Sequence, residues 1–235
     1  MKKFGFTLAE VLITLSIIGV VAALTLPSLN SAIQKNKVGP TLRKFVNTME
    51  NANDRLMAKK DADTITEITN NSGTYLEDIR SYIKGSIDSV TMNNLTNKIK
   101  TYGGNDEQIG IQSNNEPIFQ MESGDAMSVH FETNIDTENV TTPFKGFAAT
   151  ITYDINGFEN LPNRLGKDIF LFKLDNNGTV IPFGGKSDLS VYPVAGVTEP
   201  LWKSSPDCGT GEDSDAGMYC AGSVADNGWN VVYKY

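Results

Sequence analysis

The sequence begins with an apolar segment that is long enough to cross a membrane. Phe6 to Leu26 is a run of 21 residues in which Glu10 is the one charged side chain. As a helix rising about 1.5 Å per residue it would extend about 30 Å, the thickness of the hydrocarbon core of a bilayer. Lys2 and Lys3 precede it, which predicts a cytoplasmic N-terminus with the rest of the chain outside.

Length and charge can be compared with two common kinds of apolar N-terminal segment, and this run is longer than the first and differs from the second in its charge. A secretory signal peptide has an apolar core of only about 7–15 residues, followed by a cleavage site with small residues. A plain signal anchor fits the length and the basic flank but does not explain Glu10, because a carboxylate at the centre of a span costs roughly 2.5 kcal/mol or more. Either Glu10 reaches the headgroups near the cytoplasmic end, or it has a functional partner.

Beyond the apolar segment the pattern becomes amphipathic. Apolar residues recur at spacings of three and four and form one stripe: Val38, Leu42, Phe45, Val46, Met49, Ala52 and Leu56. We therefore predict one long helix from about Phe6 to Ala58, with a kink between Ala23 and Pro27, because proline removes a ladder hydrogen bond. The second half of this helix is expected to carry the globular domain.

Later segments alternate between apolar and polar residues or gather β-branched and aromatic ones, which predicts strands. The clearest are 127–132, 147–155, 168–174 and 178–183, and Asn177-Gly178 marks a tight hairpin between the last two. We predict an α+β fold in which a small antiparallel sheet packs on the second half of the helix. A short helix ending near residue 85, a loop over 93–115 and a final strand over 229–233 complete the prediction.

The composition of the chain excludes several kinds of binding and catalytic site. The 235 residues have a net charge of -8, which argues against a partner bound by general neutralisation of phosphates, so no nucleic acid is expected. A single histidine, His130, excludes sites built on a histidine pair, and two cysteines exclude four-thiolate zinc or iron–sulfur centres. No GxSxG, P-loop, CxxC or GxGxxG motif is present. We expect no enzymatic activity and no required cofactor.

The start of the chain resembles a known processing signal. The sequence Lys-Lys-Phe-Gly-Phe-Thr-Leu-Ala-Glu at residues 2–10, followed by the apolar run, resembles the class III signal of type IV pilins and type II secretion pseudopilins. The resemblance covers about the first 30 residues. It implies that a prepilin peptidase cuts between Gly5 and Phe6 on the cytoplasmic side and N-methylates Phe6. It also implies that Glu10 helps to dock each subunit into a filament.

Elementary electrostatics agrees with that implied role. Cleavage after Gly5 creates an α-amine at Phe6, one helical turn before Glu10. The ammonium of one subunit could then neutralise the carboxylate of its neighbour, and a paired charge is tolerated in an apolar core where a lone one is not.

The resemblance also implies how the chain is divided and where it works. Residues 1–5 are a cytoplasmic leader that is removed, 6–27 a transmembrane and filament-core helix, 28–58 its amphipathic continuation, and 59–235 an extracytoplasmic pilin-like domain. The protein would sit once through the bacterial inner membrane and then enter a filament in the periplasm or on the cell surface. Its partners would be the peptidase, identical or related pilin subunits and an inner-membrane assembly platform.

A loop between two predicted strands is rich in side-chain oxygens. They belong to Asp154, Asn156, Glu159, Asn160, Asn163 and Asp168. Oxygen ligands crowded on a turn with glycine suit Ca²⁺, and we name Asp154, Asn156 and Asp168 as first candidates. The loop departs from an EF-hand, since Leu165 stands where a bidentate glutamate is needed. The same residue types are also what ordinary turns use, so a purely structural turn is the alternative.

The two cysteines are 12 positions apart near the C-terminus. Outside the inner membrane the compartment is oxidising, which favours a disulfide between Cys208 and Cys220. The pair also resembles the disulfide that often closes a C-terminal loop in pilins.

Three functions are therefore open at this stage. The first is a structural subunit of a type IV pilus-like or type II secretion pseudopilus filament. The second is a signal-anchored extracytoplasmic binding or adhesion protein that only shares this leader. The third is a minor pilin that acts at a filament tip.

Overall fold

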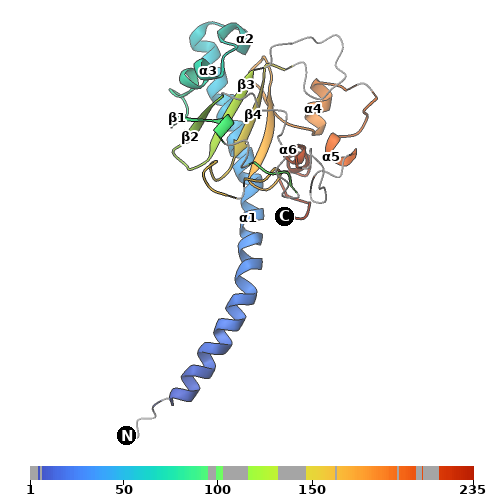
Figure 1. Cartoon of the computed structure of the whole chain (residues 1–235). Coiled ribbons are helices and arrows are strands. Elements are labelled where there is room, and N and C mark those ends of the chain that lie inside the picture. The colour runs from blue at the N-terminus through green and yellow to red at the C-terminus, as the bar shows by residue number, and fades with distance from the viewer. Residues whose placement is uncertain are drawn as a thin grey trace.

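A single long helix organises the molecule (Figure 1). The computed structural model describes residues 5, 7–94, 99–102, 116–131, 147–161, 163–194, 196–204, 208 and 217–235. Helix α1 runs from Leu8 to Lys60, and its first half projects away from the globular part as a stalk. The C-terminus lies beside α1 where this helix leaves the globular part.

Helix α1 is continuous through both of its prolines, Pro27 and Pro40. The kink predicted between Ala23 and Pro27 is reduced to a gentle curve of the stalk (Figure 1). One proline costs a single ladder bond, and neighbouring hydroxyls remain bonded to backbone carbonyls there, for example Thr25 Oγ1 to the Val21 oxygen at 2.9 Å. The helix ends at Asp61, which adopts a left-handed φ of 53° and donates its N–H to the Met57 oxygen.

The described residues of the globular part form one antiparallel sheet in which every strand pairs with the next along the chain. Its strands are β1 Gly85–Thr91, β2 Pro117–Met121, β3 Ala126–Phe131, β4 Ala149–Asp154, β5 Ile169–Leu174 and β6 Val180–Pro182. The sequence therefore predicted β3 to β6 and the α+β class. The hairpin at Asn177-Gly178 is also confirmed, with Gly178 at a φ of 86° and its N–H donated to the Asp175 oxygen.

Both faces of the sheet are buried. Successive side chains of a strand point to opposite faces, and each face packs against its own apolar cluster. On one face, Met127, Val129 and Phe172 pack with the stripe of α1, from Val38 to Leu56, in the main core. On the other face, Ile169 and Leu171 pack under the β4–β5 loop and the C-terminal region. His130 lies outside both clusters, half-exposed, with its Nδ1 2.5 Å from Glu116 Oε1.

Two buried contacts fix the sheet on α1. Asn53, fully buried on the helix, donates from Nδ2 to the Gly178 oxygen at 2.8 Å and accepts from the Tyr75 hydroxyl at 2.7 Å. The ring of Phe45 stacks on that of Tyr153 with 3.8 Å between centroids. The amphipathic half of α1 is thus held rigidly, whereas its apolar half has no packing partner among the described residues.

Short helices complete the domain: α2 Ile65–Ile68, α3 Ser72–Ile79, the 3-10 turn η1 Met92–Asn94, α4 Lys186–Val191, α5 Leu201–Ser204 and α6 Cys220–Asp226. The predicted short helix ends at Ile79 instead of near 85, because the chain from Gly85 pairs with β2 as β1. Most of the loop predicted over 93–115 lies outside the described residues.

The strand predicted over 229–233 is wrong. Trp229 follows Gly228 with positive φ angles of 64° and 66°, and the Trp229 N–H is donated to the Val224 oxygen at the end of α6. The Trp229 carbonyl lies against Gly39 of α1. A backbone that closes a helix in this way is not extended, so it forms no ladder.

Candidate functional site

The first turn of α1 forms a closed polar cap around Glu10. Thr7 is the N-cap residue, and its Oγ1 accepts the Glu10 N–H at 3.3 Å. In return Glu10 Oε2 accepts the Thr7 N–H at 2.8 Å and the Thr7 hydroxyl at 2.7 Å. This reciprocal capping box satisfies two free donors of the helix start and gives the carboxylate local partners. The cap was not predicted from the sequence, although a threonine three residues before a glutamate is its usual signature.

Gly5 and Phe6 are the predicted processing residues. Gly5 is exposed just before the N-cap, and a Cβ placed on it would meet no atom within 4 Å. No described residue therefore packs against this glycine. Phe6 lies outside the described residues.

The apolar half of α1 is exposed along its whole length. Among the described residues, α1 is the one helix long and apolar enough to cross a membrane. Its large side chains from Leu8 to Ile33 face outward, with Leu8 80% and Leu24 75% exposed. Hydroxyls in this stretch bond to carbonyls one turn earlier, as Thr14 Oγ1 does to the Glu10 oxygen at 3.0 Å, so they need no water. Such a surface requires lipid or other apolar helices around it.

The β4–β5 loop brings Asp154 and Asp168 together. Ile155 donates its N–H to the Asp168 oxygen at 2.9 Å, which closes the loop at its base. Asp154 Oδ1 accepts the Asn156 N–H at 3.0 Å, and the Asp168 carboxylate accepts the backbone N–H groups of Asn163 and Arg164. Burial raises the pKa of Asp154 to about 8, with smaller contributions from the charges of Asp168 and Asp125. Burial raises the pKa of Asp168 as well.

Three oxygens of this loop are buried without a hydrogen-bond partner: Asp154 Oδ2, Asn156 Oδ1 and Asn163 Oδ1. Asp154 and Asn163 are fully buried residues. Unpaired buried oxygens of this kind are costly, and they match the ligands that a hard cation takes. Glu159 and Asn160, also in the predicted cluster, are exposed instead. Nowhere in the described ranges do three or more His, Cys, Asp or Glu side chains form a metal-binding group, so any cation here would depend on amide oxygens.

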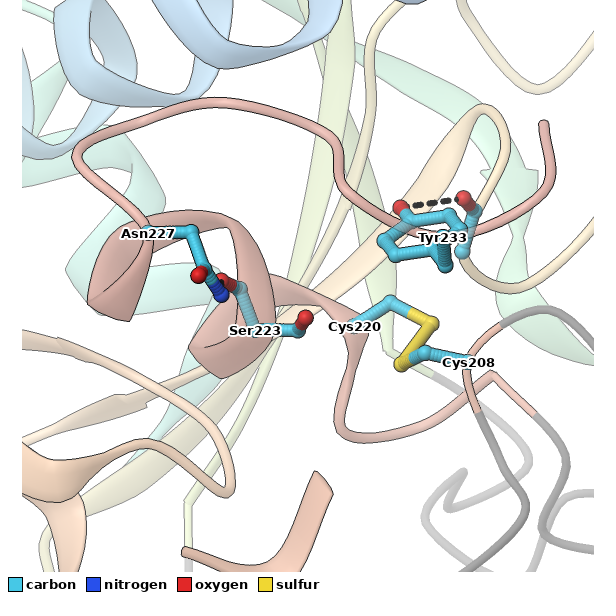
Figure 2. Close-up of a disulfide and its surroundings, with 6 residues drawn as sticks. Cys208, Cys220, Ser223, Asn227 and Tyr233 are labelled. Carbon is cyan, nitrogen blue, oxygen red and sulfur yellow. Dashed lines mark hydrogen bonds between the residues drawn. A yellow bond between two sulfur atoms is a disulfide. The ribbon is translucent and has the colours of Figure 1, made fainter. Parts of the chain in front are cut away.

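The predicted disulfide between Cys208 and Cys220 is present, with 5.4 Å between the Cα atoms (Figure 2). It joins Cys208 to the first residue of α6, next to Tyr233. The Tyr233 hydroxyl donates to the Gly166 oxygen at 2.6 Å, and a Cβ on Gly166 would lie 2.6 Å from the Cys220 sulfur. The bridge thus anchors α6 against the end of the β4–β5 loop. Most residues between the cysteines lie outside the described ranges.

The helix, the sheet and the disulfide together define a class of protein. The chain is an α+β protein held on a half-exposed apolar helix, with a glutamate in the capping box that starts this helix and a disulfide near the C-terminus of the chain. Residues 1–26 match the family model of the prokaryotic N-terminal methylation motif. This is the motif of the type IV pilin and pseudopilin family, and the chain is a type IV pilin-like protein.

The family match also bears on processing, assembly and location. The motif implies processing by prepilin peptidase and assembly into a filament, and the apolar helix fits an inner-membrane anchored, extracytoplasmic pilin. Proteins of this family are structural and not catalytic. No curated protein and no solved structure matches the chain.

Proposed function

We propose that the chain is a structural subunit of a type IV pilus-like or type II secretion pseudopilus filament. Prepilin peptidase cuts between Gly5 and Phe6, Phe6 is N-methylated, and the subunits then assemble through α1. The observation that carries this proposal is the unpartnered apolar half of α1 with Glu10 in its first turn. An adhesion protein with a simple anchor needs the apolar surface, and it would use the carboxylate for nothing beyond capping the helix.

The capping box suggests how assembly proceeds. In the isolated chain the Glu10 carboxylate accepts hydrogen bonds from Thr7, so the charge has partners while the subunit is in the membrane before assembly. On assembly the carboxylate would pair with the α-amine of Phe6 of an adjacent subunit. A charged pair in an apolar surrounding is stronger than a bond to a neutral hydroxyl, which drives the exchange.

Replacement of Glu10 tests the proposal. Glu10→Val should abolish filaments, seen by electron microscopy of cells lacking the wild-type gene, while membrane insertion and N-methylation of Phe6, seen by mass spectrometry, persist. Thr14→Val is the matched control, because it replaces another polar side chain of the same helix whose hydroxyl bonds only to its own backbone. Normal filaments from Glu10→Val would exclude assembly through this carboxylate.

We further propose that the β4–β5 loop binds one calcium ion through Asp154, Asn156, Asn163 and Asp168. The three unpaired oxygens support this, because an ion would satisfy them and the two buried carboxylates together. The ion would act as a structural brace between β4 and β5.

Thermal unfolding tests the calcium proposal. Calcium should stabilise the full chain against an EDTA-treated sample, by about 2.7 kcal/mol when free calcium is about 100 times Kd. Asp168→Asn should remove this response, whereas Glu159→Gln, a charge change on an exposed residue of the same loop, should leave it. An identical melting temperature in calcium and in EDTA would exclude the ion.

A further inference from the structure

A cleft of about 650 Å³ lies between α1 and the irregular segment after α6. We call it the α1 cleft. One wall is the outer side of α1 from Lys35 to Asn51, and the other is formed by residues 228–231. It is the surface of α1 that the sheet leaves uncovered, and it is separate from Glu10, from the β4–β5 loop and from the disulfide.

The lining of the α1 cleft has one sign of charge. Lys35, Arg43 and Lys44 line it, and none of its described lining residues is an aspartate or glutamate, although the whole chain has a net charge of -8. Lys35 Nζ donates to the Tyr233 oxygen at 3.3 Å. Arg43 and Lys44 are exposed and form no ion pair with any described residue. A concave surface with three cations attracts an anion and concentrates it locally.

The remaining lining is suited to hydroxyl groups and a flat ring. Asn36, Asn47, Thr48 and Asn230 line the same cleft. A side-chain amide offers both donors and an acceptor, the combination that hydroxyl-rich ligands require. Asn230 Nδ2 already donates to the Asn227 and Gly228 oxygens, so this residue contributes its acceptor oxygen. Trp229 is the one aromatic residue of the lining.

The backbone of Trp229 is held in an uncommon conformation. A φ of 64° is an outlier for a bulky residue and costs free energy unless the surroundings impose it. Here the surroundings do, because the Trp229 N–H is donated to the Val224 oxygen at 2.8 Å and its carbonyl packs on Gly39. A Cβ on residue 39 would lie 1.7 Å from that carbonyl oxygen. Gly39 in α1 and the strained backbone of Trp229 together hold this aromatic residue at the wall of the α1 cleft.

We propose that the α1 cleft binds a carboxylated saccharide, a segment of an acidic polysaccharide rich in uronic acids. Arg43 and Lys44 pair with its carboxylates, the asparagine amides bond to its hydroxyls, and Trp229 stacks on the apolar face of a sugar ring. A single aromatic residue among amides suits such a chain better than a nucleic acid, whose successive bases need several stacking partners. The site gives the chain a binding function that does not depend on polymerisation.

Binding is measured on the unassembled full chain in a non-ionic detergent, by isothermal titration calorimetry with short oligogalacturonate. The same oligomer with its carboxylates methyl-esterified is the ligand control, because it keeps the rings and hydroxyls and loses the charge. We expect binding of the acidic oligomer that weakens as salt is raised. Binding of the esterified oligomer should be at least ~10-fold weaker, since hydrogen bonds to charged groups are the strong ones.

Two variants and one matched control locate the site. Arg43→Gln with Lys44→Gln should weaken binding by ~10-fold or more, because it removes two charge-assisted contacts. Trp229→Asn should weaken it by a similar factor, as asparagine tolerates the positive φ but offers no aromatic ring. Lys37→Gln with Lys84→Gln removes the same charge from exposed positions outside the cleft, and the affinity should stay within about twofold.

Three results would overturn the proposal. The first is absence of binding to oligogalacturonate, and the second is unchanged affinity in the Arg43 and Lys44 variant. The third is equally tight binding of single-stranded DNA or polyphosphate with no effect of Trp229→Asn, which would make the cleft a general polyanion site. Filament formation is measured in a separate assay. A chain that fails to bind the saccharide can therefore still form filaments, and a chain that forms no filaments can still bind the saccharide.

Discussion

The ammonium nitrogen of Lys173 on β5 lies 2.5 Å from a carboxylate oxygen of Asp188 on α4, and both side chains are 1% exposed. Three aromatic rings, of Phe147, Phe183 and Tyr192, surround the ammonium at 5.0 to 5.1 Å from their centroids. The second Asp188 oxygen accepts the Gly184 N–H at 2.8 Å. Burial lowers the pKa of Lys173 and raises that of Asp188, and the attraction between them opposes both shifts.

Breaking this pair from one side should be more damaging than removing it. Lys173→Met leaves the Asp188 carboxylate buried without its cation, and we expect a loss of about 3–5 kcal/mol in the free energy of unfolding. Lys173→Met combined with Asp188→Asn removes both charges and retains an acceptor for Gly184. Urea unfolding should therefore find the double variant more stable than the single one. A double variant that is no more stable than Lys173→Met would contradict the cost assigned to the unpaired carboxylate.

The disulfide should contribute to stability because it restrains the unfolded chain. Closing a loop of this length gives roughly 3 kcal/mol in the chain-entropy model. We expect reduction of Cys208–Cys220 to lower the melting temperature of the full chain. The variant Cys208→Ala with Cys220→Ala should start from the lower value and be insensitive to reductant. A wild-type chain that melts at the same temperature with and without reductant would contradict this contribution.

Gly39→Ala should loosen the segment that follows α6. The added Cβ would lie 1.7 Å from the Trp229 carbonyl oxygen, and because that atom is backbone the whole segment must move. We expect a destabilisation of about 1–3 kcal/mol, the usual cost of overpacking, and faster amide exchange in residues 229–233. Gly19→Ala is the control, since a Cβ there meets no atom within 4 Å. Unchanged exchange in Gly39→Ala would mean that the contact is easily relieved.

Local patterns predicted those parts of the fold that depend on local physics. The stripe from Val38 to Leu56 and the turn at Asn177-Gly178 are set by spacing and by backbone preference, and both are confirmed. β1 and β2 were missed because a weakly alternating strand such as Gly85–Thr91 is defined by its partner and not by its own residues. Trp229 was misassigned for a related reason, since its conformation depends on Gly39, 190 positions earlier in the chain.

The β4–β5 loop shows the same limit for a site. The sequence identified the group of oxygens, but not that Asp154 and Asn163 are buried while Glu159 is exposed. Tertiary packing of the loop over the sheet decides which oxygens are deprived of water. Asp125 also lies close enough to add to the rise in the pKa of Asp154, although it comes from the turn before β3.

Burial of Asp154 predicts that stability depends on pH in the absence of calcium. Its pKa rises from the ordinary 3.8 to about 8 in the folded chain. Between about pH 4 and pH 8 the folded chain therefore keeps a proton that the unfolded chain has released. The free energy of unfolding should fall as pH rises through this window, by up to about 1.4 kcal/mol per pH unit, and should level off above it. The raised pKa of Asp168 acts in the same direction.

Urea unfolding in EDTA at several pH values measures this dependence, and Asp154→Asn isolates the part that belongs to one carboxyl. The variant cannot release a proton, so its stability should fall less steeply between pH 4 and pH 8 than that of the wild type. Every other titrating group is common to both chains, which makes the difference between the two curves the informative quantity. Calcium should flatten the wild-type curve near neutral pH, because the ion binds the ionised carboxylate and offsets the cost of burying its charge. Parallel curves for Asp154→Asn and the wild type would show that this carboxyl titrates normally and that the loop does not isolate it from water.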